Sequence, residues 1–309
     1  MTLIIAGHHY RQGIQWPREG IDSPTPLVLD GLFFASDSII TSGQHALLGG
    51  FRKVYPLTAR LWKPYFLDRY FHSYREVISQ VECALAFAGS TLTAQHVLNT
   101  ITEHLEKLRV SYRRALQPMV PGDYVVALHC QEAVLSRGAG TWDEDMFLPS
   151  DIEGLLTADA VSDAVLYSIN EALRSARRYK LDKAGFESLY TEFAFGLRCP
   201  VSKEYRLYCF RIQRRDVDGA MEVFTEKEEI QPGKLAVLGR VADFGVEAQT
   251  RYEAAIASGQ EPATLMFDFL NEAIDRSLAA GHRDIDRPSS LKVLSGWTSL
   301  KKKKFIPAD

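Results

Sequence analysis

Three residues of this sequence have types and positions that suit the transfer of an acyl group: Thr2, Asp37 and Lys53. Thr2 directly follows the initiator methionine, and methionine aminopeptidases accept a small second residue, so we expect a mature chain that begins with a free threonine. The α-amino group of such a residue titrates at about 7.7–8.0, near enough to neutral pH to accept the proton of its own hydroxyl. A nearby cation lowers that pKa further. We therefore predict Thr2 as nucleophile and base, Lys53 as the assisting cation and Asp37 as the residue that orients Lys53.

The elements that must position these residues are short apolar runs. Residues 3–7 are continuously apolar, which predicts a strand that is buried on both faces and presents Thr2 at its start. Residues 32–35 predict a second buried strand, and Asp37 stands just beyond its end. Lys53 follows the aspartate by sixteen residues. A partly buried carboxylate next to an ammonium group holds both the position and the charge of that ammonium.

This arrangement of residues resembles a known family. Residues 32–54, which read LFFASDSIITSGQHALLGGFRKV, are similar without a gap to the proteasome β-type family of N-terminal nucleophile (Ntn) hydrolases. The similarity includes the Asp-to-Lys interval, Gly43, Gly49 and the Arg52-Lys53-Val54 triplet. It is greatest to the bacterial proteasome-like peptidase that pairs with a hexameric unfoldase. The opening residues TLIIAGHH also resemble the family's first strand, which presents the threonine.

A second block with the same resemblance is residues 86–94, AFAGSTLTA. It is similar to the family's strand-to-helix turn, whose first residue donates its backbone N–H to the oxyanion. That residue is Ala86 here, whereas family members have glycine. The alanine still offers an N–H, provided that its backbone angles tolerate a Cβ.

The resemblance implies a fold, a reaction and an assembly. The fold would be an α+β, four-layer αββα Ntn-hydrolase sandwich with insertions. In the reaction, Thr2 Oγ would attack an amide carbonyl, and water would then hydrolyse the ester on Thr2. The substrates would be polypeptides or peptides, and no cofactor or metal would take part. Family members stack into homo-oligomeric rings, often with an ATP-dependent unfoldase at the entrance.

The sequence departs from the family at two places near the expected site. The family has an Asp-x-x-Ser-Gly-Gly turn that hydrogen-bonds the N-terminal amine; Asp286 and Ser289 keep the interval here, but both glycines are absent. In another alignment with the family, Asp284 would take the place of Asp286. We prefer the alignment with Asp286 and Ser289. Arg240 stands where the family has a serine that supports the amine, and an arginine cannot accept a hydrogen bond. We therefore consider a substrate carboxylate as a ligand for Arg240.

These departures leave two alternatives to a threonine peptidase. One is a catalytically silent scaffold subunit that kept the fold, as α-type proteasome subunits do. The other is a non-proteolytic amidase or transpeptidase that uses the same residues, for which Arg240 and the long insertions are the motivating features.

Composition excludes several other classes. The 309 residues carry a net charge of −3, which argues against a dedicated nucleic-acid-binding protein. No run approaches the roughly 18–20 apolar residues of a membrane span, and no signal peptide is visible, so we expect a cytoplasmic protein. The four cysteines lie far apart, without a Cys-x-x-Cys pair, and are interpreted as small buried hydrophobic residues. His96 and His129 are interpreted as structural residues.

We expect one domain over residues 1–309. Relative to the family it would carry insertions at about 10–26, 63–76 and 117–180, and a solvated basic tail at 300–309. The Asp30-Gly31 pair predicts a hairpin turn between two strands.

Helices are predicted by apolar residues at the 3.6-residue period. One begins at Ser90 or Thr91 and others cover residues 151–180, 184–197, 244–258 and 263–280.

Overall fold

The computed structural model describes residues 2–13, 27–42, 45–113, 122–131, 142, 144–179, 181–217, 220–296 and 301–306. The predicted insertion at 10–26 therefore lies mostly outside the described residues, as do parts of the one at 117–180. Strands and helices are mixed along the chain, and the predicted α+β class is confirmed.

Most strands form two sheets. The smaller has the order β12-β1-β2-β13-β14, with bounds β1 Leu3–Gln12, β2 Leu27–Ser36, β12 Leu235–Gly239, β13 Ser289–Leu294 and β14 Lys301–Phe305. The larger has the order β11-β10-β9-β6-β5-β7-β8, with bounds β5 Val54–Leu67, β6 Tyr70–Gly89, β7 Leu108–Arg113, β8 Asp123–Ala127, β9 Thr191–Arg198, β10 Tyr205–Val217 and β11 Ala220–Ile230. A separate pair joins β3 Ile40–Ser42 to β4 His45–Leu48.

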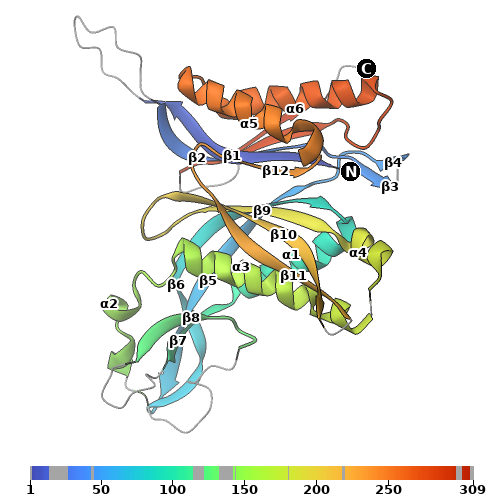
Figure 1. The fold of residues 1–309 in the computed structure, drawn as a ribbon. Helices are drawn as coiled ribbons and strands as arrows, with labels where there is room; N and C mark the ends of the chain where they lie inside the picture. The colour runs from blue at the N-terminus through green and yellow to red at the C-terminus, as the bar shows by residue number, and fades with distance from the viewer. Residues whose placement is uncertain are drawn as a thin grey trace, which may run out of the picture.

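Helices cover the outer face of each sheet (Figure 1). On the smaller sheet lie α5 Val241–Ala257 and α6 Pro262–Ala279. On the larger sheet lie α1 Thr91–Glu106 and α3 Ala158–Leu173. The remaining helical segments are α2 Pro149–Ile152, α4 Lys183–Leu189 and the 3₁₀ turns Glu144–Phe147 and Arg174–Tyr179. Figure 1 shows the order helices, sheet, sheet, helices from top to bottom.

The first strand is buried on both faces because it lies between two apolar layers. Leu3 and Ile5 face the apolar cluster under α5 and α6, whereas Ile4 and Ala6 face the cluster between the sheets. Strand side chains alternate between faces, so a continuous apolar run satisfies both layers at once. The prediction for residues 3–7 is confirmed.

The predicted hairpin turn at Asp30-Gly31 is wrong. Both residues lie inside β2, which runs without reversal from Leu27 to Ser36 and pairs with β1 along its length. The register shifts by one residue opposite Gly31, between His9 and Tyr10. A Cβ on Gly31 would lie 2.4 Å from the carbonyl oxygen of Leu294. The glycine therefore allows a bulge and a close backbone approach, not a turn.

The predicted helix over 184–197 is wrong in its second half. The helix α4 begins at the N-cap Asp182, whose Oδ1 accepts the N–H of Gly185 at 2.7 Å, and it ends at Leu189. Residues 191–198 then form β9, which lies between β6 and β10 and is buried over nearly its whole length. A short apolar run of this kind suits a central strand as well as a buried helix, and only the pairing distinguishes the two.

Within the predicted solvated tail at 300–309, residues 303–306 are exposed, and part of the backbone is paired in a sheet. Lys301–Phe305 form β14, the edge strand of the smaller sheet, which pairs antiparallel with β13. Residues 297–300 and 307–309 lie outside the described part. Lysines on an edge strand discourage pairing with another chain, so the basic run protects the edge of this sheet.

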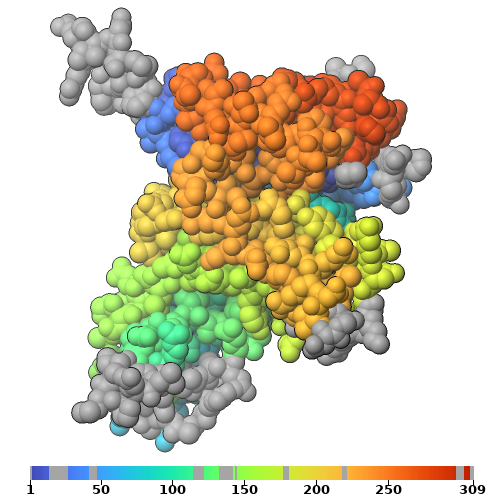
Figure 2. Space-filling view, viewed as in Figure 1, coloured from blue at the N-terminus to red at the C-terminus, as the bar shows by residue number. Residues whose placement is uncertain are grey.

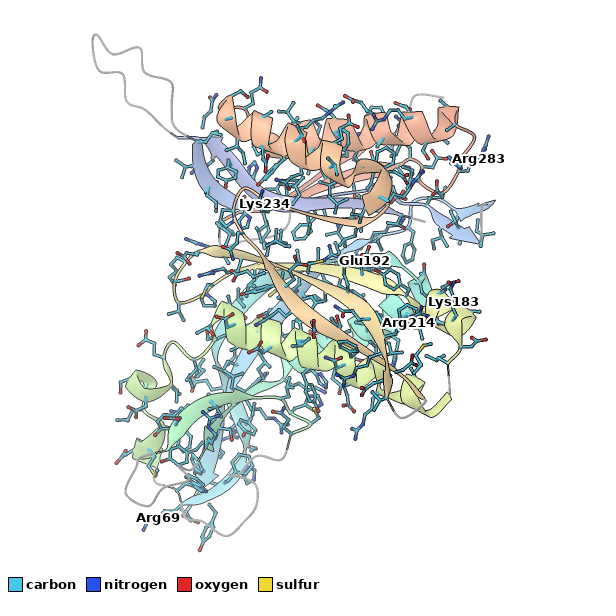
Figure 3. All side chains as sticks on the ribbon, viewed as in Figure 1. Arg69, Lys183, Glu192, Arg214, Lys234 and Arg283 are labelled. Atoms are coloured by element: carbon cyan, nitrogen blue, oxygen red, sulfur yellow. The ribbon has the colours of Figure 1, made fainter. Side chains whose placement is uncertain are left out.

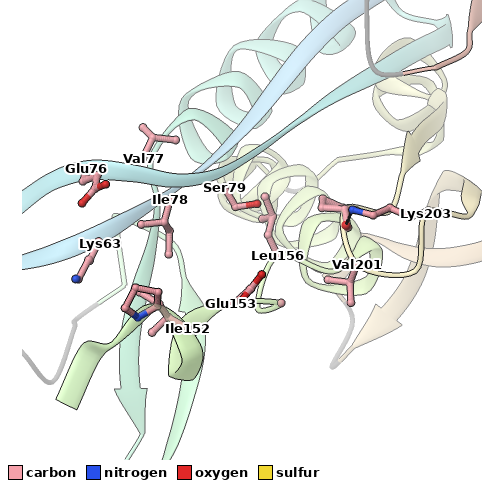
Figure 4. Close-up of a pocket in the computed structure, with 13 residues that line it drawn as sticks. Lys63, Glu76, Val77, Ile78, Ser79, Ile152, Glu153, Leu156, Val201 and Lys203 are labelled. Atoms are coloured by element: carbon pink, nitrogen blue, oxygen red, sulfur yellow. Dashed lines mark hydrogen bonds between the residues drawn. The ribbon is translucent and has the colours of Figure 1, made fainter. Parts of the chain in front are cut away.

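The expected insertion at 63–76 coincides with the outer end of the long β5–β6 hairpin, whose strands stay paired up to Leu67 and Tyr70. In Figure 2, α5 and α6 cover one end of the molecule and this hairpin lies at the other, with Arg69 labelled at its tip in Figure 3. A cavity of about 660 Å³ lies between the hairpin, α2 and the turn after β9 (Figure 4). Its lining includes Lys63, Glu76, Ile152 and Val201, and does not include Thr2.

Candidate active site

The structure brings Thr2, Asp37 and Lys53 together. Lys53 Nζ lies 2.8 Å from Thr2 Oγ1 and 2.7 Å from Asp37 Oδ2. The lysine and aspartate side chains are only 3% and 0% exposed, and Thr2 is buried as well. A hydroxyl, an ammonium and a carboxylate therefore form one hydrogen-bonded chain that bulk water hardly reaches.

The Asp37 carboxylate is held by the backbone on both sides. Its Oδ1 accepts the N–H of Leu3 at 3.0 Å, and its Oδ2 accepts the N–H of Ile39 at 3.2 Å. The N–H of Asp37 donates in turn to the carbonyl oxygen of Leu3 at 3.3 Å. Because β1 and β2 pair with Ile4 opposite Ser36, the residue after Thr2 and the end of β2 are neighbours. The carboxylate thus fixes the chain beside Thr2 as well as the lysine.

Burial changes the proton affinity of the ion pair. It lowers the pKa of Lys53 below that of an ordinary lysine, although the Asp37 carboxylate opposes the change. Burial likewise raises the pKa of Asp37, against the effect of the Lys53 ammonium and the two amide donors. The Lys53 ammonium, whose Nζ donates to Thr2 Oγ1, stabilises the negative charge that forms when this hydroxyl loses its proton. Since its Nζ reaches Thr2 Oγ1, Lys53 is placed to assist the removal of the hydroxyl proton.

The backbone of Thr2 is held by the corner between β12 and α5. The N–H of Arg240 donates to the carbonyl oxygen of Thr2 at 3.1 Å. Gly239 has a φ of +83°, and a Cβ there would lie 1.9 Å from that same oxygen. Only glycine permits this contact and this backbone conformation. The corner therefore seats the first residues of β1.

The guanidinium group of Arg240 hydrogen-bonds to side chains of the same protein. Its Nε lies 2.7 Å from Asp243 Oδ2, and its Nη1 lies 2.6 Å from Ser277 Oγ and 3.2 Å from Asp284 Oδ1. The side chains of Arg240 and Asp284 are each only 12% exposed. The arginine joins the corner beside Thr2 to α6 and to the segment before β13, and the binding of a substrate carboxylate by Arg240 stays a prediction.

The structure does not bring Asp286 and Ser289 to the threonine through any described hydrogen bond. Asp286 Oδ1 accepts the N–H of the next residue, Arg287, at 2.7 Å. Ser289 Oγ lies 2.7 Å from Asn271 Oδ1 on α6. Asp284, which we set aside, is the residue linked to the corner beside Thr2, through Arg240. The contacts therefore favour the other alignment for the acid near the N-terminus.

The backbone N–H of Ala86 has its direction set by the register of two strand ladders. Ala86 lies opposite Val54 in β5 and opposite Ala194 in β9. The N–H of Phe87 donates to the carbonyl oxygen of Lys53 at 3.1 Å, and amides of an antiparallel strand alternate in direction. The N–H of Ala86 is thus directed toward β9. Its expected oxyanion role would require this part of the ladder to rearrange.

Glu192 is a buried acid near the site that the sequence analysis missed. It lies on β9 opposite Ala88 and is labelled in Figure 3. Its Oε2 accepts the N–H of Gly239 at 2.6 Å, and its Oε1 lies 3.2 Å from Arg211 Nε and 3.1 Å from the Tyr190 hydroxyl. The carboxylate thus joins the larger sheet to the corner that seats Thr2. No spacing motif marks it; a single acid directly before the apolar residues 193–197 is the only signal in the sequence.

Within the described ranges, no group of three or more His, Cys, Asp or Glu side chains could hold a metal ion. None of the helices described is both long and apolar enough to cross a membrane. Cys83, Cys199 and Cys209 are buried as predicted, whereas Cys130 is exposed, which corrects the interpretation for that residue.

Matches to known proteins were found among solved structures. No family model matches the chain, and no curated protein matches it. Among solved structures, Anbu (ancestral beta-subunit) from Yersinia bercovieri aligns with 98% of this chain and 86% of its own, at 13% sequence identity and a TM-score of 0.48.

Proposed function

We propose that this protein is a threonine amidohydrolase of the proteasome β type, with a freed Thr2 as its nucleophile. The observation that carries the proposal is the buried chain from Thr2 Oγ1 through Lys53 Nζ to Asp37. The resemblance of residues 32–54 to the proteasome β-type family adds to it, because Asp37 and Lys53 stand there at the family's Asp-to-Lys interval. On this proposal the chain forms one Ntn-hydrolase sandwich.

The reaction follows from the properties of these groups. Thr2 Oγ bonds to the carbonyl carbon of an amide, while its proton passes to the α-amino group with the help of Lys53. The amine leaves with a proton as the carbon–nitrogen bond breaks, and an ester remains on Thr2. A water molecule then adds to the ester carbon, releases the acid and restores the hydroxyl. Asp37 keeps Lys53 in place throughout.

The assembly and substrate are also part of the proposal. A homo-oligomeric ring, peptide or polypeptide substrates and an ATP-dependent unfoldase as partner are what the family resemblance implies. One argument for the amidase or transpeptidase alternative was that Arg240 could bind a substrate carboxylate. The guanidinium group contacts Asp243, Ser277 and Asp284, and these contacts weaken that argument.

One observation favours the second candidate, a catalytically silent scaffold. The Ala86 N–H is directed toward β9, so the amide that the family uses for the oxyanion is engaged elsewhere. Oxyanion donors contribute about 10²–10³ in rate, and their loss would leave Thr2 weakly reactive.

Covalent labelling separates the two candidates. The purified protein is treated with a β-lactone or a peptide epoxyketone, and intact mass followed by peptide mapping locates the adduct. Active protein carries one adduct on Thr2 and has lost Met1. Protein that retains Met1, or that stays unlabelled after Met1 is lost, supports the scaffold and contradicts the hydrolase.

A further inference from the structure

A second cluster of reactive side chains lies on the helical layer of the larger sheet, apart from the threonine site. Its members are His104 at the end of α1, Ser168 and Tyr167 on α3, and Cys130 in the turn after β8. His104 Nε2 lies 3.5 Å from Cys130 Sγ, and its Nδ1 lies 2.8 Å from Ser168 Oγ. The Tyr167 hydroxyl lies 3.8 Å from the same sulfur. An exposed thiol thus contacts a histidine that a third residue holds.

The hydrogen bonds of Ser168 determine which nitrogen of His104 carries the proton. Ser168 Oγ lies 2.6 Å from the carbonyl oxygen of Ala164, a distance that requires the hydroxyl proton between the two oxygens. The hydroxyl therefore accepts a hydrogen bond from His104 Nδ1–H. In a neutral ring the other nitrogen then has a lone pair, and it faces Cys130.

Burial keeps this imidazole neutral. His104 is only 5% exposed, and burial lowers its pKa, with His129 acting in the same direction as a like charge. Glu103 and Glu171 oppose the shift, and Lys107 adds to it. At neutral pH the ring is therefore a proton acceptor beside a thiol, which is the arrangement of a base-activated nucleophile.

We propose that Cys130 is a modification site: a thiol that His104 activates by general-base catalysis and that exchanges with small disulfides. In the step, the Cys130 proton moves to His104 Nε2 and the sulfur attacks one sulfur of the disulfide. The disulfide bond breaks, and the departing thiolate takes a proton back from His104 Nε2. The products are a mixed disulfide on Cys130 and one free thiol. Ser168 is a positioning residue that holds the ring and its tautomer.

The other thiols provide internal controls. Burial raises the pKa of Cys209 to about 12 and raises that of Cys83 as well, so both should react slowly. Cys199 is the competitor, because contacts with Ser202 lower its pKa, although it is buried.

The test uses the full chain and 4,4′-dithiodipyridine, a neutral disulfide whose released thiopyridone absorbs light. The first thiol to react should be Cys130, identified by peptide mapping and absent in Cys130→Ser. His104→Gln should slow this reaction at pH 7 at least about tenfold, since a general base contributes about 10²–10⁴. His96→Gln, an exposed histidine on the same helix, should leave the rate unchanged.

The pH profile of the unmodified protein tests the proposal even if the His104 variant does not fold. A thiol that reacts through ionisation alone gains rate about tenfold per pH unit up to a pKa of about 8.5. A thiol with a neutral histidine as base should instead show a nearly flat rate between about pH 6.5 and 8. Ser168→Ala should shift this profile. Faster labelling of Cys199, an unchanged rate in His104→Gln, or an ordinary thiol profile each overturns the proposal. None of these outcomes depends on Thr2.

Discussion

Lys53 and Asp37 form an ion pair that is sealed from water, with Nζ and Oδ2 2.7 Å apart and side chains 3% and 0% exposed. Such a pair is costly to bury unless further hydrogen bonds satisfy it, and here the Thr2 hydroxyl and two backbone amides do so. The arrangement holds one cation against one hydroxyl at the start of β1.

Removal of Lys53 should abolish turnover and labelling while the fold persists. Thr2→Ala and Lys53→Ala should each reduce peptide hydrolysis by more than about 100-fold, because both groups act in the chemical step. The control is Lys183→Ala, an exposed lysine on α4 that should retain full activity. Circular dichroism checks the fold. Hydrolysis by Lys53→Ala at the rate of the unmodified protein would refute the assigned role.

Breaking the ion pair from one side should destabilise the protein more than removing it whole. Asp37→Ala leaves the Lys53 ammonium buried without its counter-charge, which should cost about 3–5 kcal/mol in free energy of unfolding. The double variant Asp37→Ala/Lys53→Met should recover part of this loss, because no buried charge is left. Urea denaturation of all variants measures the coupling. Additive losses would contradict a direct interaction between the two side chains.

Replacement of Glu192 should destabilise the corner between β12 and α5 that holds the backbone of Thr2. Glu192→Ala leaves the N–H of Gly239 without its acceptor, at an expected cost of about 1–3 kcal/mol in stability, and it should lower activity by loosening Thr2. The matched control is Glu228→Ala, which removes an exposed partner of the same Arg211 and should cost less than about 1 kcal/mol. Equal losses in the two variants would show that the buried contact has no special importance.

Stability should fall in mild acid because of His8. Burial lowers the pKa of His8 from 6.5 to about 4, so the unfolded chain binds the proton first as the pH drops. Stability from this residue is therefore fully present above about pH 6.5 and is lost as the pH falls toward 4, by up to about 3 kcal/mol. His9 shifts in the same direction. Urea unfolding between pH 7 and 4 measures the slope.

The variant His8→Gln should flatten that slope. His96→Gln, which removes an exposed histidine, should leave the slope as it is. A slope that persists in full without His8 would assign the acid sensitivity to other groups.

Short-range sequence patterns correctly predicted several elements of the fold. Ser90 was one of two predicted N-caps of α1, and its Oγ accepts the N–H of Thr93. The apolar run at residues 3–7 became a strand buried on both faces. Both signals lie within a few residues of the feature they predict, so no long-range contact was needed to interpret them.

Local patterns failed where pairing between strands decides the outcome. Asp30-Gly31 has the composition of a turn, yet pairing with β1 on both sides of this point keeps β2 extended through it. Residues 191–197 are apolar enough for a helix, yet β6 and β10 pair with them on both edges. Hydrogen bonds to strands distant in the sequence outweighed the local preference in both cases.

The sequence by itself determined which residues form the hydrogen-bonded chain of Thr2, Lys53 and Asp37. Their residue types, the position of Thr2 after Met1 and the interval from Asp37 to Lys53 can all be recognised without a structure. Only the tertiary structure decided the direction of the Ala86 amide, the partners of Arg240 and the contact of Cys130 with His104. The first depends on the register of two ladders. The contacts of Arg240 and of Cys130 join side chains from different helices, strands and turns. No spacing rule in the sequence predicts contacts of this kind.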